Sequence, residues 1–218
     1  MRKRVSAASD ASRLAAIVTM LFTGALITAL PSRYQLGPNW LSYTAVGAML
    51  GAMLLPVFFP RNAQALRIER IVVLVLVVLA EIGNVISTTR LIADMMKHHH
   101  NYGSIALLQS AAAIWTLNVV LPAFLYWHLD RGGPGSQRES TSVARDFNFA
   151  DDRSAADLPQ PPGFVDYIYL AFAVSTAFVL PDYMRPISAR AKLITLGQAL
   201  VSIATLFLIA ARAISTLS

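Results

Sequence analysis

Six long apolar runs, separated by polar connectors, set the pattern of this 218-residue chain. The runs lie at residues 14–30, 40–59, 68–89, 104–129, 164–180 and 191–214. Each approaches the roughly 20 residues that a helix needs to cross the hydrocarbon core of a bilayer. The pattern therefore predicts a single all-α domain, residues 1–218, built as a polytopic transmembrane bundle of six helices.

Two polar segments interrupt the apolar pattern. Residues 1–13, MRKRVSAASDASR, form a basic leader ahead of the first run. Residues 130–163 are rich in Gly, Pro, Ser and Asp, and they carry six acidic and four basic side chains. This composition buries too little apolar surface to fold alone, so we expect a surface loop. Phe147 and Phe149 are expected to pin the middle of this loop to the bundle.

The distribution of Lys and Arg predicts the orientation, because cytoplasmic connectors carry an excess of both. Seven of them lie in the leader and in the connector after the second run, against three on the opposite side, Arg33, Arg90 and Lys97. The bias places the N-terminus and the 130–163 loop in the cytoplasm. Arginine outnumbers lysine 15 to 3, which suggests a GC-rich bacterial genome and hence a bacterial inner membrane.

The stretch STAFVLPDYMRP, residues 175–186, leaves two topologies open. In the first, residues 164–180 cross the membrane, and six crossings leave both termini in the cytoplasm. In the second, residues 164–180 form a re-entrant half-helix beside five crossings. The charge rule prefers the second, because Arg185, Arg190 and Lys192 then lie in the cytoplasm. Irregular backbone at membrane depth is tolerated only where protein or water lines it, so six crossings are the prediction.

Composition narrows the classes of function. Hydrophobic residues make up 56% of the chain and charged residues 14%, against roughly a quarter charged in soluble domains. The lipid bilayer is therefore the expected partner. Topology and anionic headgroups account for the net charge of +6, so nucleic acid is not expected. The chain has no cysteine and no catalytic or phosphate-binding motif, so we expect neither an enzyme nor a cofactor.

A polar stripe follows the last apolar run. Thr195, Gln198, Ser202 and Thr205 recur at i, i+3, i+7 and i+10, with Arg212 further along the same face. Such side chains should face the bundle or a water-filled cavity rather than lipid. The stripe predicts either interhelical hydrogen bonds, typically worth under about 1 kcal/mol per pair, or a solvated substrate path.

Glu81 is the one acidic residue near the middle of the third run, and Asn84 follows it on the same face. An ionised carboxylate at this depth costs several kcal/mol unless it is paired, protonated or hydrated. Two hypotheses remain open, a proton or cation site in a transport path and a structural polar contact. Its candidate partners are Arg212, Lys192 and the amide of Asn118.

Two further segments carry polar side chains that resemble sites. KHHHN, residues 97–101, has only Asp94 as a nearby carboxylate, so a solvated loop is favoured over a metal site. PDYMRP is expected to form a rigid turn, because its two prolines stop helix on both sides. Asp182 and Arg185 can close that turn as an ion pair, or they can gate or bind a charged ligand at the mouth of the bundle.

Gly47 and Gly51 form a G-x-x-x-G pair in the second run. Small residues four apart let two helix backbones approach closely. Packing within the bundle is the favoured interpretation, and a homo-oligomer or a membrane-protein partner is the alternative.

The C-terminal half resembles a family of uncharacterised bacterial multi-pass membrane proteins. The segments that carry the resemblance are WHLDRGGPG, RDFNFADD and the stretch GFVDYIYLAFAVSTAF through LIAARAI. The family typically has a DYLY-x-x-F-T segment, then FS-x-x-D-x-x-P, then a K-L-x-x-x-x-Q helix that ends in ARA. The chain departs from this pattern at Val179, which replaces Ser, and at Leu180 and Pro181 before the Asp. The resemblance implies a helical bundle and assigns no biochemical role.

The same half is distantly similar to the pore module of potassium channels. Set against TTVGYGD, residues 176–182 are TAFVLPD, so Thr176 and Asp182 match. Both filter glycines are replaced, by Val179 and Pro181, and a filter of stacked carbonyls needs backbone geometry that these residues do not adopt. A potassium-selective filter is excluded, and a pore-like scaffold without that filter remains a hypothesis.

Two functions follow from these patterns, transport of an ion or small solute and a non-transporting scaffold or accessory subunit. Transport predicts a hydrated cavity that reaches Glu81 and the Gln198 stripe. A scaffold predicts a dry core in which those polar groups are paired, with the G-x-x-x-G face and the 130–163 loop holding a partner.

Overall fold

A computed structural model describes residues 2–35, 37–59, 62–96, 104–130, 145–149, 162–176 and 184–217. It contains six α-helices: α1 (Arg2–Ala29), α2 (Asn39–Phe58), α3 (Ala63–Met96), α4 (Ser104–Leu129), α5 (Phe164–Ser175) and α6 (Ala189–Leu217). A 3-10 turn η1 (Ser32–Tyr34) and two short strands, β1 (Phe147–Phe149) and β2 (Met184–Pro186), complete the described elements. The predicted all-α bundle of six helices is confirmed.

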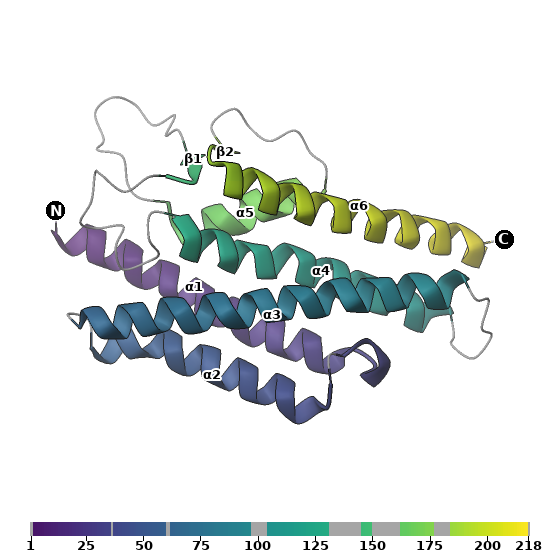
Figure 1. Ribbon diagram of the computed structural model, residues 1–218, viewed down its shortest axis with the longest axis horizontal. Helices are drawn as coiled ribbons and strands as arrows, with labels where there is room; N and C mark the ends of the chain where they lie inside the picture. The colour runs from purple at the N-terminus through teal and green to yellow at the C-terminus, as the bar shows by residue number, and fades with distance from the viewer. Residues whose placement is uncertain are drawn as a thin grey trace.

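Five helices run side by side along the long axis of the molecule, and α4 lies between α3 and α6 (Figure 1). These five, all except α5, are long and apolar enough to cross a membrane. The protein is therefore an integral membrane protein by the length and composition of its helices. The two ends of the chain lie at opposite ends of the bundle (Figure 1).

The core follows α4, which packs against α1, α3, α5 and α6. Residues 117–128 of this helix, LNVVLPAFLYWH, are buried without interruption, because neighbours surround the helix on every side. Gly24 on α1 allows a close approach to α2, since a Cβ at this position would lie 3.1 Å from Val46.

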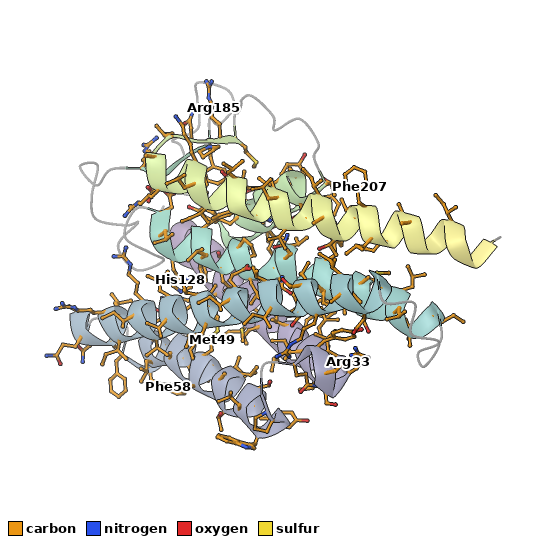
Figure 2. All side chains as sticks on the ribbon, turned by 45° about the vertical axis from the view of Figure 1, so that its right-hand side comes forward. Arg33, Met49, Phe58, His128, Arg185 and Phe207 are labelled. Carbon is orange, nitrogen blue, oxygen red and sulfur yellow. The ribbon has the colours of Figure 1, made fainter. Side chains whose placement is uncertain are left out.

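The outer surface of the bundle is apolar. Large hydrophobic side chains on α1, α2, α3 and α6 are exposed, and Phe58 and Phe207 point away from the helices, each 73% exposed (Figure 2). An apolar surface of this extent is stable only under lipid or a partner protein. The buried residues of the same helices contact other helices of the bundle, so each helix has a lipid-facing side and a core-facing side.

The prediction that residues 164–180 cross the membrane is wrong. The helix α5 has 12 residues, which at 1.5 Å per residue is about 18 Å, against about 30 Å of hydrocarbon. Strand β1 precedes α5 and β2 follows it, yet the two strands pair antiparallel, with Asn148 opposite Arg185. The strands before and after α5 therefore lie at the same end of the bundle, so α5 is re-entrant.

Local contacts fix the start of α5 against the N-terminal part of the chain. The Asp166 carboxylate accepts a hydrogen bond from the Gly163 backbone N–H at 2.7 Å, and the Ser12 hydroxyl accepts one from the Phe164 N–H at 2.7 Å. These contacts satisfy amides that have no partner inside the helix. They also place the start of α5 beside α1, at the end of the bundle where the chain begins.

Candidate functional site

The polar stripe of α6 faces the interior of the bundle. Thr195, Gln198, Ser202 and Thr205 are each at most 7% exposed. The Thr195 and Thr205 hydroxyls donate to carbonyls of their own helix, at 3.0 Å to Ala191 and 2.7 Å to Val201. The side chains of Gln198 and Ser202 instead reach the neighbouring helices.

Gln198 lies at the centre of a network that joins α4, α5 and α6. Its amide nitrogen shares its two protons among three acceptors, the carbonyls of Asn118 at 3.0 Å and Ala171 at 2.8 Å and the Ser175 hydroxyl at 2.7 Å. Its amide oxygen accepts a hydrogen bond from the Tyr126 hydroxyl. One side chain thus holds four groups on two other helices.

Asn118 on α4 completes this network. Its amide nitrogen donates to the Gln198 carbonyl at 3.1 Å and to the Ser202 hydroxyl at 2.5 Å. The Ser175 hydroxyl donates to the Asn118 carbonyl at 3.3 Å. The network binds the last turn of α5 to the middle of the bundle, where polar groups need protein partners in place of water. Of the two interpretations of the stripe, these contacts match interhelical hydrogen bonding.

Glu81 is not part of this network. It lies on α3, where its Oε1 atom is buried and has no hydrogen-bond partner among the described residues. Of its predicted partners, the Asn118 amide donates to α6 and its oxygen has no partner among the described residues, Glu81 included. Lys192 is exposed, and the Arg212 side chain lies outside the described part of the structure. Tyr126 is close enough to interact electrostatically with the carboxyl group.

Asn84 also lies apart from the α6 stripe. It is 3% exposed, and its side chain faces a cavity between α1, α2, α3 and α4. Neither polar atom of the amide has a partner among the described residues. The predicted path is therefore divided between three places in the structure: the network around Gln198, the unpaired Glu81 carboxyl and the cavity at Asn84.

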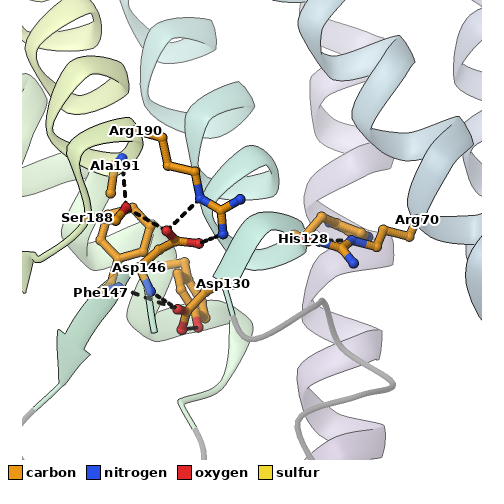
Figure 3. A network of polar contacts seen from close by, with 9 residues as sticks. Arg70, His128, Asp130, Asp146, Phe147, Ser188, Arg190 and Ala191 are labelled. Atoms are coloured by element: carbon orange, nitrogen blue, oxygen red, sulfur yellow. Dashed lines mark hydrogen bonds and ion pairs between the residues drawn. The ribbon is translucent and has the colours of Figure 1, made fainter. Parts of the chain in front are cut away.

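A cluster that the sequence patterns missed ties the polar loop to the bundle. Asp130, at the end of α4, accepts hydrogen bonds from the Tyr167 hydroxyl at 2.7 Å and from the Asp146 N–H at 2.8 Å (Figure 3). Asp146 in turn accepts from the Ser188 hydroxyl at 2.6 Å and from Arg190 Nε at 2.7 Å (Figure 3). We call these five residues the loop clamp.

Aromatic side chains pack against the loop clamp. Phe147 is 1% exposed, and its ring lies 4.8 Å from Tyr126 and 6.3 Å from Tyr167 between centroids. Phe149 lies 5.0 Å from the same Tyr167 ring. The prediction that Phe147 and Phe149 pin the middle of the loop is confirmed.

The electrostatics of the loop clamp favour an ionised Asp146. Burial alone would raise the pKa of this carboxyl group. Hydrogen bonds from Arg190 and Ser188 and the positive charges of Arg190 and Arg70 outweigh the effect of burial, so the pKa lies below its ordinary value of 3.8. Arg70 itself donates to the carbonyl of His128 at 3.2 Å (Figure 3). The clamp is therefore charged and intact at neutral pH.

The candidate loop and gate residues do not meet in the described structure. Thr176 ends α5, and its hydroxyl donates to the Phe172 carbonyl at 2.9 Å. Arg185 is exposed in β2 and points away from the bundle (Figure 2). Asp182 lies outside the described residues, so its ion pair with Arg185 stays a prediction.

The Gly47 and Gly51 pair does not pack inside the bundle. Both residues are exposed on α2, and no atom lies within 4 Å of the position that a Cβ would take at either. The favoured interpretation was packing within the bundle, but this face of α2 points outward. The helices α1 and α3 contact α2 from its other side. An interface with another helix stays a prediction.

The histidine segment at 97–101 lies outside the described residues. Asp94, its nearest carboxylate, accepts a hydrogen bond from the Tyr34 hydroxyl at 2.9 Å and forms an ion pair with Arg33. Within the described ranges, no three His, Asp or Glu side chains are grouped to hold a metal ion.

Comparison with known proteins does not assign a function to the chain. No protein-family model, characterised protein or solved structure matches the chain. Three features of the structure bear on function: the paired network at Gln198, the unpaired carboxyl group of Glu81 and the loop clamp.

Proposed function

We propose that the protein is a non-catalytic, non-transporting membrane scaffold or accessory subunit. The observation that carries this proposal is the network at Gln198. A transport path needs polar groups that are free to exchange water or solute partners. The stripe side chains instead donate to carbonyls and hydroxyls of the protein, and they hold α5 in place.

The contact with a partner is assigned to the outward face of α2. Gly47 and Gly51 leave its backbone uncovered, and the neighbouring Ala48 is also exposed. A second helix can approach such a face closely, which increases van der Waals contact in the absence of a hydrophobic driving force between helices. The partner is a helix of another membrane protein or a second copy of this chain.

We also propose a bacterial inner-membrane location with the N-terminus in the cytoplasm. The re-entrant α5 brings Arg185, Arg190 and Lys192 to the end of the bundle where the chain begins, which adds three positive charges to the cytoplasmic side. Membership of the bacterial multi-pass family belongs to the same proposal. The segments that carry that resemblance supply all of the loop clamp, including Asp130 and Asp146.

The scaffold proposal is tested by flux and by cross-linking. In proteoliposomes we expect proton, sodium and potassium flux equal to that of empty vesicles. For cross-linking, the cysteine-free chain allows a single Gly47→Cys variant in native membranes, with Leu200→Cys, exposed on α6, as the matched control. Disulfide-linked species should form with Gly47→Cys and not with Leu200→Cys. Flux above the empty vesicles, or equal cross-linking of both variants, would contradict the proposal.

A second candidate function, proton or cation transport, is favoured by one observation. The buried Oε1 atom of Glu81 has no partner among the described residues, and an unpaired carboxyl group at membrane depth is a candidate site for a proton or cation. The test is Glu81→Gln in the same proteoliposomes. Transport through this site requires measurable flux that the substitution abolishes while the protein still folds. Unchanged flux excludes the carboxyl group as the site.

A further inference from the structure

A cavity of about 320 Å³ lies in the half of the bundle away from the Gln198 network. It is lined by α1, α2, α3, α4 and the η1 turn, and most of its lining is apolar, including Met20, Met49, Val77 and Leu121. None of the described residues that line it is charged. A charged ligand would lose its hydration there without gaining a counter-ion, so the occupant must be neutral.

The cavity has one polar region. Among its lining residues, the hydroxyls of Thr23 and Ser87 donate to carbonyls of their own helices, at 2.7 Å to Thr19 and 2.8 Å to Gly83. The protons of these two hydroxyls are therefore already used in hydrogen bonds. Among the described residues that line the cavity, Asn84 and Gln35 have buried side-chain atoms with no hydrogen-bond partner.

Asn84 and Gln35 offer both kinds of hydrogen bond to a ligand. Both atoms of the Asn84 amide are buried and unpartnered among the described residues, and so is the Gln35 Oε1 atom. The Gln35 nitrogen donates to the Leu30 carbonyl at 2.7 Å. Leaving such groups unsatisfied destabilises the folded protein. A hydroxyl group both donates and accepts, so it satisfies either residue.

Two of the residues that line the cavity are also exposed on the outside of the bundle. Leu41 on α2 and Leu79 on α3 line it and are 42% and 51% exposed on the lipid-facing surface. A ligand dissolved in the bilayer therefore has an apolar route to the cavity. A volume of 320 Å³ holds about ten groups of the size of a water molecule, at about 30 Å³ each.

We propose that this cavity is a binding site for a neutral, lipid-soluble alcohol or phenol of about this size. The hydroxyl group binds Asn84 or Gln35, and the apolar body fills the space between α1 and α4. This site is independent of the scaffold function, because it uses neither the Gln198 network nor the outward face of α2.

The test uses decanol that carries a photoactivatable diazirine and an alkyne tag. The purified protein in nanodiscs is irradiated with this probe, and the labelled peptides are identified by mass spectrometry. We expect saturable labelling of the cavity-lining parts of α2 and α3, and competition by unlabelled decanol at least tenfold stronger than by decane. Labelling that does not saturate, or that is spread evenly over the lipid-facing helices, would overturn the proposal.

Two matched pairs of variants locate the site. Ala45→Phe fills the cavity, whereas Ala48→Phe places the same ring on the exposed face of the same helix. The first should reduce saturable labelling at least tenfold and the second by less than twofold. Equal effects of the two variants would overturn the site.

Asn84→Leu removes the hydrogen-bonding amide, and Thr88→Val, one turn away on α3, removes a hydroxyl that already donates to the Asn84 carbonyl at 2.9 Å. Asn84→Leu should abolish the preference for decanol over decane, and Thr88→Val should leave it unchanged. The wild type could show no preference for decanol over decane although Ala45→Phe blocks labelling. In that case the cavity holds only an apolar chain, and the proposal of an alcohol ligand is refuted. The Ala45 and Ala48 pair keeps the test decisive if Asn84→Leu fails to fold.

Discussion

Replacing Gln198 by leucine removes the centre of the network that holds α5. The change eliminates three interhelical hydrogen bonds, because the Gln198 amide nitrogen shares two protons among its three acceptors and the amide oxygen accepts one bond from Tyr126. Interhelical hydrogen bonds in membrane proteins average about 0.6 kcal/mol, so the three contribute about 1.8 kcal/mol. Leucine has a similar volume, which keeps the loss of packing small. We expect the free energy of unfolding to fall by about 2 kcal/mol.

The assay is reversible unfolding in mixed micelles with increasing denaturing detergent, followed by tryptophan fluorescence. Gln109→Leu is the matched control, because Gln109 is exposed on α4. It should change the free energy of unfolding by less than about 0.5 kcal/mol.

A second measurement separates loss of the network from general destabilisation. A cysteine at Thr176, at the end of α5, should react faster with a water-soluble maleimide in the Gln198→Leu background, because α5 loses its contacts with α6. Equal stability of the Gln198→Leu and Gln109→Leu proteins, together with unchanged labelling, would refute the conclusion that the stripe holds the re-entrant helix.

Four other substitutions have definite expected outcomes. Asp146→Asn should lower the free energy of unfolding by about 1 kcal/mol at pH 7, since the lost bonds include a charged pair with Arg190 that is partly exposed. Because the pKa of Asp146 is lowered, its contribution to stability is complete above pH 5 and is lost as the pH falls below 3.8. The free energy of unfolding of the variant should therefore change less with pH across this range than that of the wild type. Arg13→Met should lower the free energy of unfolding by about 3 kcal/mol, because it leaves Glu69, 2% exposed, without its ion pair at 3.3 Å. Glu69→Gln should lower it by less in the same assay. Phe147→Ala should cost about 3 kcal/mol and expose the loop to limited proteolysis at low protease concentration.

The helices that cross the membrane were predictable from the sequence, because their apolar runs are long and lipid imposes one solution on the backbone. The run at 164–180 is the exception. It is apolar enough to cross, but only residues 164–175 are helical before the described part of the segment ends at Thr176. The pairing of β1 with β2 decides the topology, and that pairing joins segments 37 residues apart, Asn148 and Arg185.

The polar stripe was predictable as a buried face, but its partners were not. Periodicity places Gln198 and Ser202 on one side of a helix, and it contains no information about which helix lies opposite. Ser175 and Ala171 become partners only because α5 turns back into the bundle. The loop clamp was hidden for a related reason: Asp130 and Asp146 lie in a segment whose composition resembles a solvated loop.

The orientation of the α2 glycines was open for a different reason. A G-x-x-x-G pair shows that two backbones can approach, and it does not show whether the second backbone belongs to the same chain. In the structure, Gly24 on α1 makes the close approach to α2 instead, opposite Val46. Gly47 and Gly51 are left on the outer face.

The central claim is that α5 is re-entrant, with five helices crossing the membrane. Cysteine accessibility tests it most directly, with single cysteines at Arg145, Ile187 and Ser32, all exposed in this otherwise cysteine-free chain. We expect Arg145→Cys and Ile187→Cys to react with an impermeant maleimide from the same side of the membrane, and Ser32→Cys from the opposite side. Labelling of Ile187→Cys from the side of Ser32→Cys would show that residues 164–180 cross the membrane, and would contradict the re-entrant helix.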